Sequence, residues 1–107
     1  MKKIHASGYY HRMAASFADC GLAAKNGGDA GRAITMYEHA LNFELDALNT
    51  FPDETPPEQT LEFYRNAISY AIECGRTRKA KHLIGTALSC HPSPEVIVIL
   101  ESLLTTL

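Results

Sequence analysis

Apolar side chains recur every three or four positions along most of the 107-residue chain, which is the pattern of helices that each bury one face. Alanine, methionine and leucine fill the segment from Ala6 to Asn26, and a glycine pair ends it. Asp29 then provides an N-cap for a second helix, which we expect to stop at Phe51 because a proline follows. The first half of the chain therefore predicts two long helices joined by a glycine turn.

The second half of the chain follows the same plan after a proline-rich loop at 52–57. Thr55 and Glu58 have the spacing of a capping box, with Pro56 expected at the first helical position. Val96–Ile99 is a β-branched run, but it continues into leucines at helical spacing, so we assign it to a helix. The helices predicted after the loop span residues 56–74, 77–90 and about 93–107.

An offset of 47 residues brings the two halves of the chain into register. The aligned identities are Ala24 and Ala71, Gly28 and Gly75, Ala33 and Ala80, Ala40 and Ala87, and Leu41 and Leu88. Most of these are small residues or turn glycines, which helix hairpins need where their backbones approach closely. Internal repetition on this scale indicates stacked helical units.

These positions resemble the tetratricopeptide repeat family. The matching residues are Phe17, Cys20, Gly21, Ala24, Gly28, Ala33 and Tyr37 in the first half, and Tyr64, Ala67, Ile68, Ala71, Gly75, Ala80, Ile84 and Pro92 in the second. The resemblance implies an all-α, TPR-like superhelix of five helices in one domain. Its first repeat would span residues 6–52, its second 56–92, and a capping helix 93–107.

The spacing of the repeats departs from the family pattern. The family period is about 34 residues, and the first hairpin has Leu45 where the closing proline is expected. Its second helix is therefore predicted to be long, about 33 Å to Phe51. Two repeats are also fewer than a solenoid usually needs. Either the long helices and the last helix supply the missing burial, or the protein forms a homo-oligomer.

The resemblance also implies a groove lined by the first helix of each repeat, which would bind a peptide or a partner helix. The corresponding residues are Ala15, Ala18, Leu22 and Lys25 in the first repeat, and Glu62, Arg65, Asn66, Ser69 and Glu73 in the second. Some family members hold a partner's C-terminal carboxylate with lysine, asparagine and arginine. Only Asn66 matches that set here, so we reject a carboxylate clamp. The alternative is a groove too short to bind anything.

Apolar residues outside the core stripes predict a second contact surface. Met36 and Phe43 lie off the stripe of the second helix, and Val98 and Ile99 lie on the far side of the last helix. Exposed apolar groups that cluster mark interfaces, so this set predicts self-association or docking of a partner. The alternative is that long neighbouring helices cover these side chains.

The charge distribution bears on the partner. The chain has 10 lysine and arginine residues against 12 acidic residues, a formal net charge of −2, which disfavours nucleic acid and anionic membranes as partners. The exception is a basic cluster at a helix N-terminus, where cations oppose the helix dipole, formed by Arg76, Arg78, Lys79 and Lys81. This cluster suits an acidic partner. It also gives the alternative function, a regulatory domain that binds nucleic acid or an anionic ligand.

No motif for catalysis, phosphate binding or metal binding occurs, so we expect no enzymatic activity, no cofactor and no metal site. Cys20, Cys74 and Cys90 lack paired spacing and predict buried or half-buried thiols of a reducing compartment rather than a redox pair. With no signal-peptide core and no membrane-spanning run, we expect a cytoplasmic location. The expected function is a non-enzymatic interaction module, an adaptor or small chaperone-like scaffold, for a protein or peptide partner.

Overall fold

The computed structural model describes residues 6–52 and 55–107, and the regular secondary structure of this part is all helix, without strands. Its five helices are α1 (Ala6–Asn26), α2 (Ala30–Asn49), α3 (Pro57–Glu73), α4 (Thr77–Ser89) and α5 (Pro94–Thr106). The predicted all-α fold class is confirmed, and the Val96–Ile99 run lies within α5 as expected.

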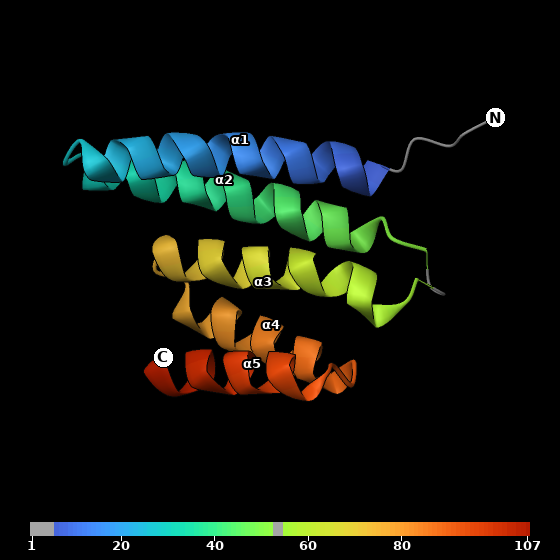
Figure 1. Cartoon of the computed structure of the whole chain (residues 1–107). Coiled ribbons are helices and arrows are strands. Elements are labelled where there is room, and N and C mark those ends of the chain that lie inside the picture. Colours follow the sequence, from blue (N-terminus) through green and yellow to red (C-terminus); the bar gives the residue numbers. More distant parts are fainter. Residues whose placement is uncertain (1–5, 53–54) are drawn as a thin grey trace.

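The helices alternate in direction and form two layers (Figure 1). α1, α3 and α5 run parallel to one another in one layer, and α2 and α4 run antiparallel to them in the other. Each helix packs mainly against its neighbours in sequence, which gives a slab with Cα extents of 42 × 40 × 19 Å. Such consecutive packing is the arrangement of stacked helix hairpins.

The turns α1–α2 and α3–α4 have the same geometry, 47 residues apart. Gly28 and Gly75 have φ angles of 81° and 79°, in the left-handed region that glycine adopts without a steric cost. In both turns the N–H after the glycine donates to an alanine carbonyl five residues earlier, which is the Schellman arrangement. The bonds are Asp29 N to Ala24 O at 2.9 Å and Arg76 N to Ala71 O at 2.8 Å.

The predicted start of α3 is wrong by one residue. Thr55 does not cap the helix: Pro56 occupies the N-cap position with φ −58° and ψ 141°, and no side chain caps the helix. The cause is the second proline, Pro57, since the residue before a proline is excluded from helical geometry. Residues 53–54 of the predicted loop lie outside the described residues.

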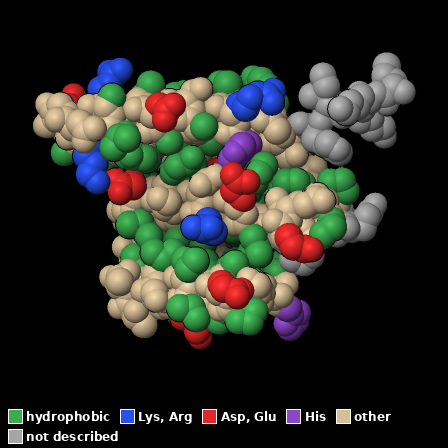
Figure 2. All heavy atoms as spheres, viewed as in Figure 1, with side chains coloured by type: hydrophobic (Ala, Val, Ile, Leu, Met, Phe, Trp, Pro, Cys, Tyr) green, Lys and Arg blue, Asp and Glu red, His purple; other side chains and the backbone are tan. Residues whose placement is uncertain are grey.

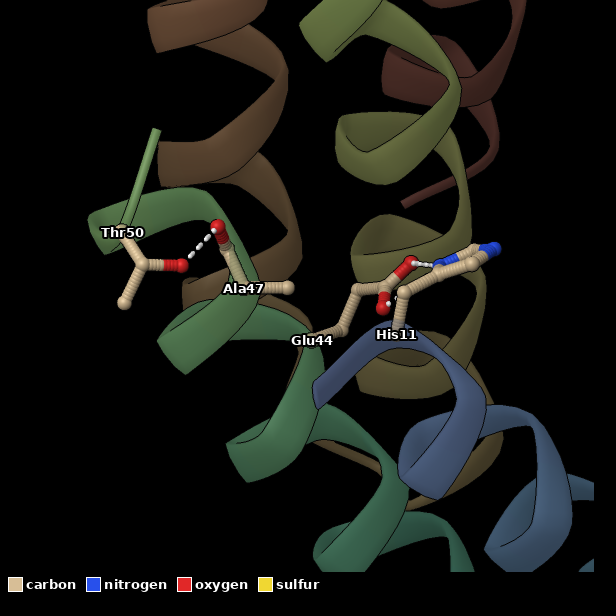
Figure 3. A network of polar contacts seen from close by, with 4 residues as sticks. All are labelled: His11, Glu44, Ala47 and Thr50. Atoms are coloured by element: carbon tan, nitrogen blue, oxygen red, sulfur yellow. Dashed lines mark hydrogen bonds and ion pairs between the residues drawn. The ribbon is translucent and has the colours of Figure 1, made fainter. Parts of the chain in front are cut away.

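The end of α2 also differs from the prediction. The helix ends at Asn49 rather than Phe51, and the Thr50 hydroxyl donates to the carbonyl of Ala47 at 2.9 Å (Figure 3). The N-cap prediction for the same helix is confirmed, since the Asp29 side chain accepts from the backbone N–H of Arg32 at 3.1 Å. At 20 residues α2 is about 30 Å long, shorter than expected.

Close packing of α1 on α2 depends on Gly21. A Cβ atom at this position would lie 2.9 Å from two ring carbons of Tyr37, whose side chain is buried. The repeat-aligned alanines Ala40 and Ala87 are fully buried, as hairpin packing requires. Gly21 and Tyr37, two of the residues that match the repeat pattern, are thus packed against each other.

We expect Gly21→Ala to destabilise the protein by about 1–3 kcal/mol, because the added methyl group displaces a buried ring. The matched control is Gly85→Ala in α4, where a Cβ meets nothing within 4 Å. That change should stabilise the protein by up to about 1 kcal/mol through helix propensity. Urea unfolding of the three proteins measures both effects, and equal stability of the two variants would contradict this packing.

Candidate functional site

A groove runs along the surface between α3 and α5. It consists of two adjoining cavities of about 520 and 590 Å³, and because both are lined by Glu62 and Arg65 they form one continuous feature, the α3–α5 groove. Figure 2 shows hydrophobic side chains gathered in the band between these helices. The remaining lining residues are Asn66, Ser69, Ile72, Glu73, Ile99 and Leu103 in the first cavity, and Glu58, Leu61, His91, Pro92, Ser93 and Val96 in the second.

The two walls of the α3–α5 groove differ in chemistry. The α5 wall is apolar, because Val96, Ile99 and Leu103 follow one another at helical spacing along its groove-facing side. Leu100 of the same helix is fully buried and anchors α5 to the core. The α3 wall is mainly polar. It carries three carboxylates, one guanidinium group, one amide and one hydroxyl, from Glu58, Glu62, Glu73, Arg65, Asn66 and Ser69. A segment with one apolar and one polar side fits these two walls.

All five groove residues predicted in the second repeat, Glu62, Arg65, Asn66, Ser69 and Glu73, line the α3–α5 groove. Of those predicted in the first repeat, Lys25 lies at its edge, where the Nζ atom is 3.0 Å from a carboxylate oxygen of Glu73. Ala15 and Ala18 are half-buried and Leu22 is exposed on α1, outside both cavities. Of the two repeats, only the second lines the groove, together with α5.

Sequence reasoning missed the apolar wall of the groove. It assigned Ile99 to an outer surface together with Val98. Both side chains are exposed, 39% for Ile99 and 63% for Val98, but Ile99 also lines the groove. The signal was present in the i, i+3, i+7 spacing of Val96, Ile99 and Leu103. This spacing shows that the three residues share one side of α5. It does not show that this side lies next to α3, which depends on the tertiary arrangement of the helices.

A buried carboxylate of α2 contacts both α1 and α3 (Figure 3). Glu44 of α2 has no exposed surface, and its two carboxylate oxygens lie 2.9 and 3.0 Å from Nδ1 of His11 on α1. The His11 ring stacks on Phe63 of α3 with centroids 4.2 Å apart. The side chain of Asn66, which lines the groove, also hydrogen-bonds Glu44. One side chain of α2 thus ties α1 and α3 together.

Burial raises the pKa of Glu44 above its ordinary value, because the charged carboxylate loses water. The hydrogen bond from His11, the attraction to that residue and the hydrogen bond with Asn66 oppose this effect without cancelling it. No motif indicated this network. Its only sequence signal is a glutamate on the apolar stripe of its helix, three residues after Leu41 and three before Ala47.

The raised pKa of Glu44 makes stability depend on pH with a defined sign. Where the folded state holds a proton that the unfolded state has lost, the free energy of unfolding falls as pH rises. As pH rises from 4.5, the ordinary pKa, towards neutrality, the wild type should therefore lose stability relative to Glu44→Gln, which cannot titrate. Urea unfolding at several pH values measures this difference; a constant or opposite difference would count against a desolvated Glu44.

Three of the four residues of the predicted basic cluster line one cavity, and the fourth lies outside it. Arg76, Arg78 and Lys79 line a shallow cavity of about 680 Å³ at the start of α4, whereas Lys81 is exposed outside it. The Arg76 Nη2 atom lies 3.2 Å from a carboxylate oxygen of Glu38 on α2. One cation of the cluster is thus engaged within the protein.

The four residues of the predicted apolar interface do not lie on one surface. Met36 and Phe43 are half-buried on α2, and Val98 and Ile99 lie on α5, with α3 and α4 between these helices (Figure 1). The Phe43 ring stacks on Phe17 of its own hairpin at 5.5 Å between centroids. Neighbouring side chains therefore cover much of the α2 part.

The three cysteines are free thiols, and burial raises the pKa of Cys74. The expectation of three buried or half-buried thiols is wrong for Cys20, which is exposed on α1. Within residues 6–52 and 55–107, no three histidine, cysteine or acidic side chains are grouped as a metal site would require. In the same residues no helix has both the length and the apolar character to cross a membrane.

The chain was compared with protein families, curated proteins and solved structures, and no match was found in any of the three. What the structure establishes is an all-α fold of consecutive helix hairpins closed by α5.

Proposed function

We propose that this protein is a non-enzymatic interaction module of the tetratricopeptide type, which binds a segment of a partner protein in the α3–α5 groove. The observation that carries the proposal is the groove itself, with a polar wall from α3 and an apolar wall from α5. Amphipathic helices dock in such grooves by their apolar faces. The module would act as an adaptor or a small chaperone-like scaffold.

The kinship with tetratricopeptide repeats is supported by the hairpin geometry. Gly28 and Gly75 close the two hairpins with the same hydrogen bonds, and Gly21 lies against the ring of Tyr37, at positions that the family pattern reserves for small and large residues. The family's groove is formed by the first helices of successive repeats. α3 and α5 occupy the corresponding places here.

The groove is suited to binding without rearrangement. The core residues Ile68 and Ala71 fix α3, and Leu100 fixes α5, so the two walls are packed helices. The α4–α5 connection supplies the rest of the lining of the second cavity. A preformed site avoids the entropy cost of ordering its walls when a ligand binds. Each cavity has the size of a small-ligand pocket, and together they offer room for several side chains.

The alternative function, binding of nucleic acid or another anion at the basic cluster, makes a different prediction. Its support is the cavity lined by Arg78 and Lys79 at the start of α4. Binding of this kind would weaken with rising salt and would be lost in Arg78→Glu/Lys81→Glu.

The proposed groove is tested with ligands selected from a displayed library of random peptides. Selected peptides should bind Ile99→Asn at least tenfold more weakly than the wild type, because this change places an amide in the apolar wall. Val98→Asn, the adjacent residue outside the groove, is the matched control and should bind normally. Affinity is measured by fluorescence anisotropy. Peptides that bind both variants equally well, or that need Arg78 and Lys81, would refute the proposed site.

A further inference from the structure

We propose that the occupant of the α3–α5 groove is a cationic amphipathic helix that lies antiparallel to α3 and α5, an inference that rests on the groove being the binding site. Three observations on these two helices carry it: the sign of their charges, the spacing of the apolar wall, and the common direction of the helices.

The charges of the two walls are mainly negative. α3 and α5 together carry five carboxylates and a single cation, Arg65. Of the carboxylates, Glu58, Glu62 and Glu73 line the groove, whereas Glu95 and Glu101 lie outside both cavities. Glu73 is paired with Lys25 at 3.0 Å, whereas no ion pair of Glu58 or Glu62 forms among the described residues. Both of these unpaired carboxylates line the groove. A partner with lysine or arginine beside them gains complementary charge.

Most basic side chains of the second hairpin lie on α4, in the other layer (Figure 1). α4 contains Arg78, Lys79 and Lys81 and no carboxylate, so charge of opposite sign is separated between the layers in this half of the molecule. An anionic segment would therefore be attracted to α4 and repelled from the groove. The groove favours cations because its lining has a single arginine, Arg65, against the carboxylates of Glu58, Glu62 and Glu73.

The apolar wall has the spacing of a helix that faces another helix. Val96, Ile99 and Leu103 stand at i, i+3 and i+7, two turns of α5, and present a ridge about 10 Å long. The α3 wall from Glu58 to Glu73 extends for about 22 Å, the length of a helix of about 15 residues. A partner helix of this length would bury its apolar stripe against α5 and direct its basic residues towards the Glu58 and Glu62 carboxylates.

The expected direction of the bound helix follows from the parallel orientation of α1, α3 and α5 in their layer. The C-terminal ends of α1, α3 and α5 meet at one edge of the slab, and their N-terminal ends lie at the opposite edge (Figure 1). Helix C-termini carry partial negative charge, and helix N-termini carry partial positive charge. A helix in the groove is favoured when its N-terminus lies near Glu73 and its C-terminus lies near Ser93. The occupant would then have the same direction as α2 and α4.

The test uses three designed peptides of about 15 residues with a fluorescent label. The first has a leucine stripe at helical spacing with lysine elsewhere, the second replaces every lysine by glutamate, and the third scrambles the order of the first. At low salt we expect the cationic helix to bind at least tenfold more tightly than the anionic helix or the scrambled peptide. Its affinity should fall when the salt concentration is raised to about 0.5 M.

Substitutions of the exposed charged residues in the α3 wall show which charges contribute to binding of the cationic helix. Glu58→Gln/Glu62→Gln should weaken binding of the cationic helix at least fivefold, whereas Arg65→Gln should bind it as tightly as the wild type or more tightly. All three side chains are exposed, so the folds of these variants are checked by thermal unfolding alone. Equal affinity of the double variant and the wild type would overturn the assignment of the charge.

The direction of the bound helix is read from spin labels placed at either end of the cationic peptide. A label at its N-terminus should broaden the methyl resonances of Leu103, and a label at its C-terminus should broaden those of Val96. The reverse pattern would overturn the antiparallel orientation.

The outcomes distinguish failure of the cationic-helix assignment from failure of the proposed function, which is binding of a partner segment in the α3–α5 groove. If the anionic helix binds in the groove and loses affinity in Ile99→Asn, the groove is a binding site and the cationic assignment is wrong. If no peptide, designed or selected, is sensitive to Ile99→Asn, the proposed function itself fails. Binding of the scrambled peptide as tightly as the ordered one would show attraction by charge alone and would overturn the helical occupant.

Discussion

Two glycines with positive φ, Gly28 and Gly75, reverse the chain at the same point of each hairpin, and the rest of the structure depends on this reversal. The two turns have the same hydrogen bonds, so α2 and α4 reverse from α1 and α3 in the same way, and α1, α3 and α5 lie in one layer with the same direction. Where α4 ends, His91 takes φ 55° in place of a glycine, and Pro92 has no N–H to complete the Schellman pair. α5 nevertheless returns to the layer of α3, and the groove forms between them.

Helix α3, which forms one wall of the groove, is linked to a buried carboxylate on α2. A carboxylate with no exposed surface is costly to bury, and the hydrogen bonds that Glu44 receives offset part of that cost. Its partners come from both neighbouring helices, so α1, α2 and α3 fit together in one register. Asn66 belongs to both this network and the groove lining, which links the position of a groove side chain to the buried carboxylate.

The sequence could predict what local physics decides. Helix α1 was predicted with its observed bounds and the turn glycines were identified, because periodicity and capping are local. The α3 residues predicted for a groove line the two cavities between α3 and α5. The start of α3 was missed because two adjacent prolines compete for one helical position. The apolar wall of α5 and the Glu44–His11 pair were missed because each joins residues that only the tertiary arrangement brings together.

The central claim is that α5 presents its Ile99 side to a partner helix while Val98 faces solvent. Intermolecular nuclear Overhauser effects between the cationic peptide and the methyl groups of the protein test it most directly. We predict contacts from the leucines of the peptide to Val96, Ile99 and Leu103, with none to Val98. Contacts to Val98, or to the start of α4 at Arg78, would contradict the α3–α5 groove as the binding site.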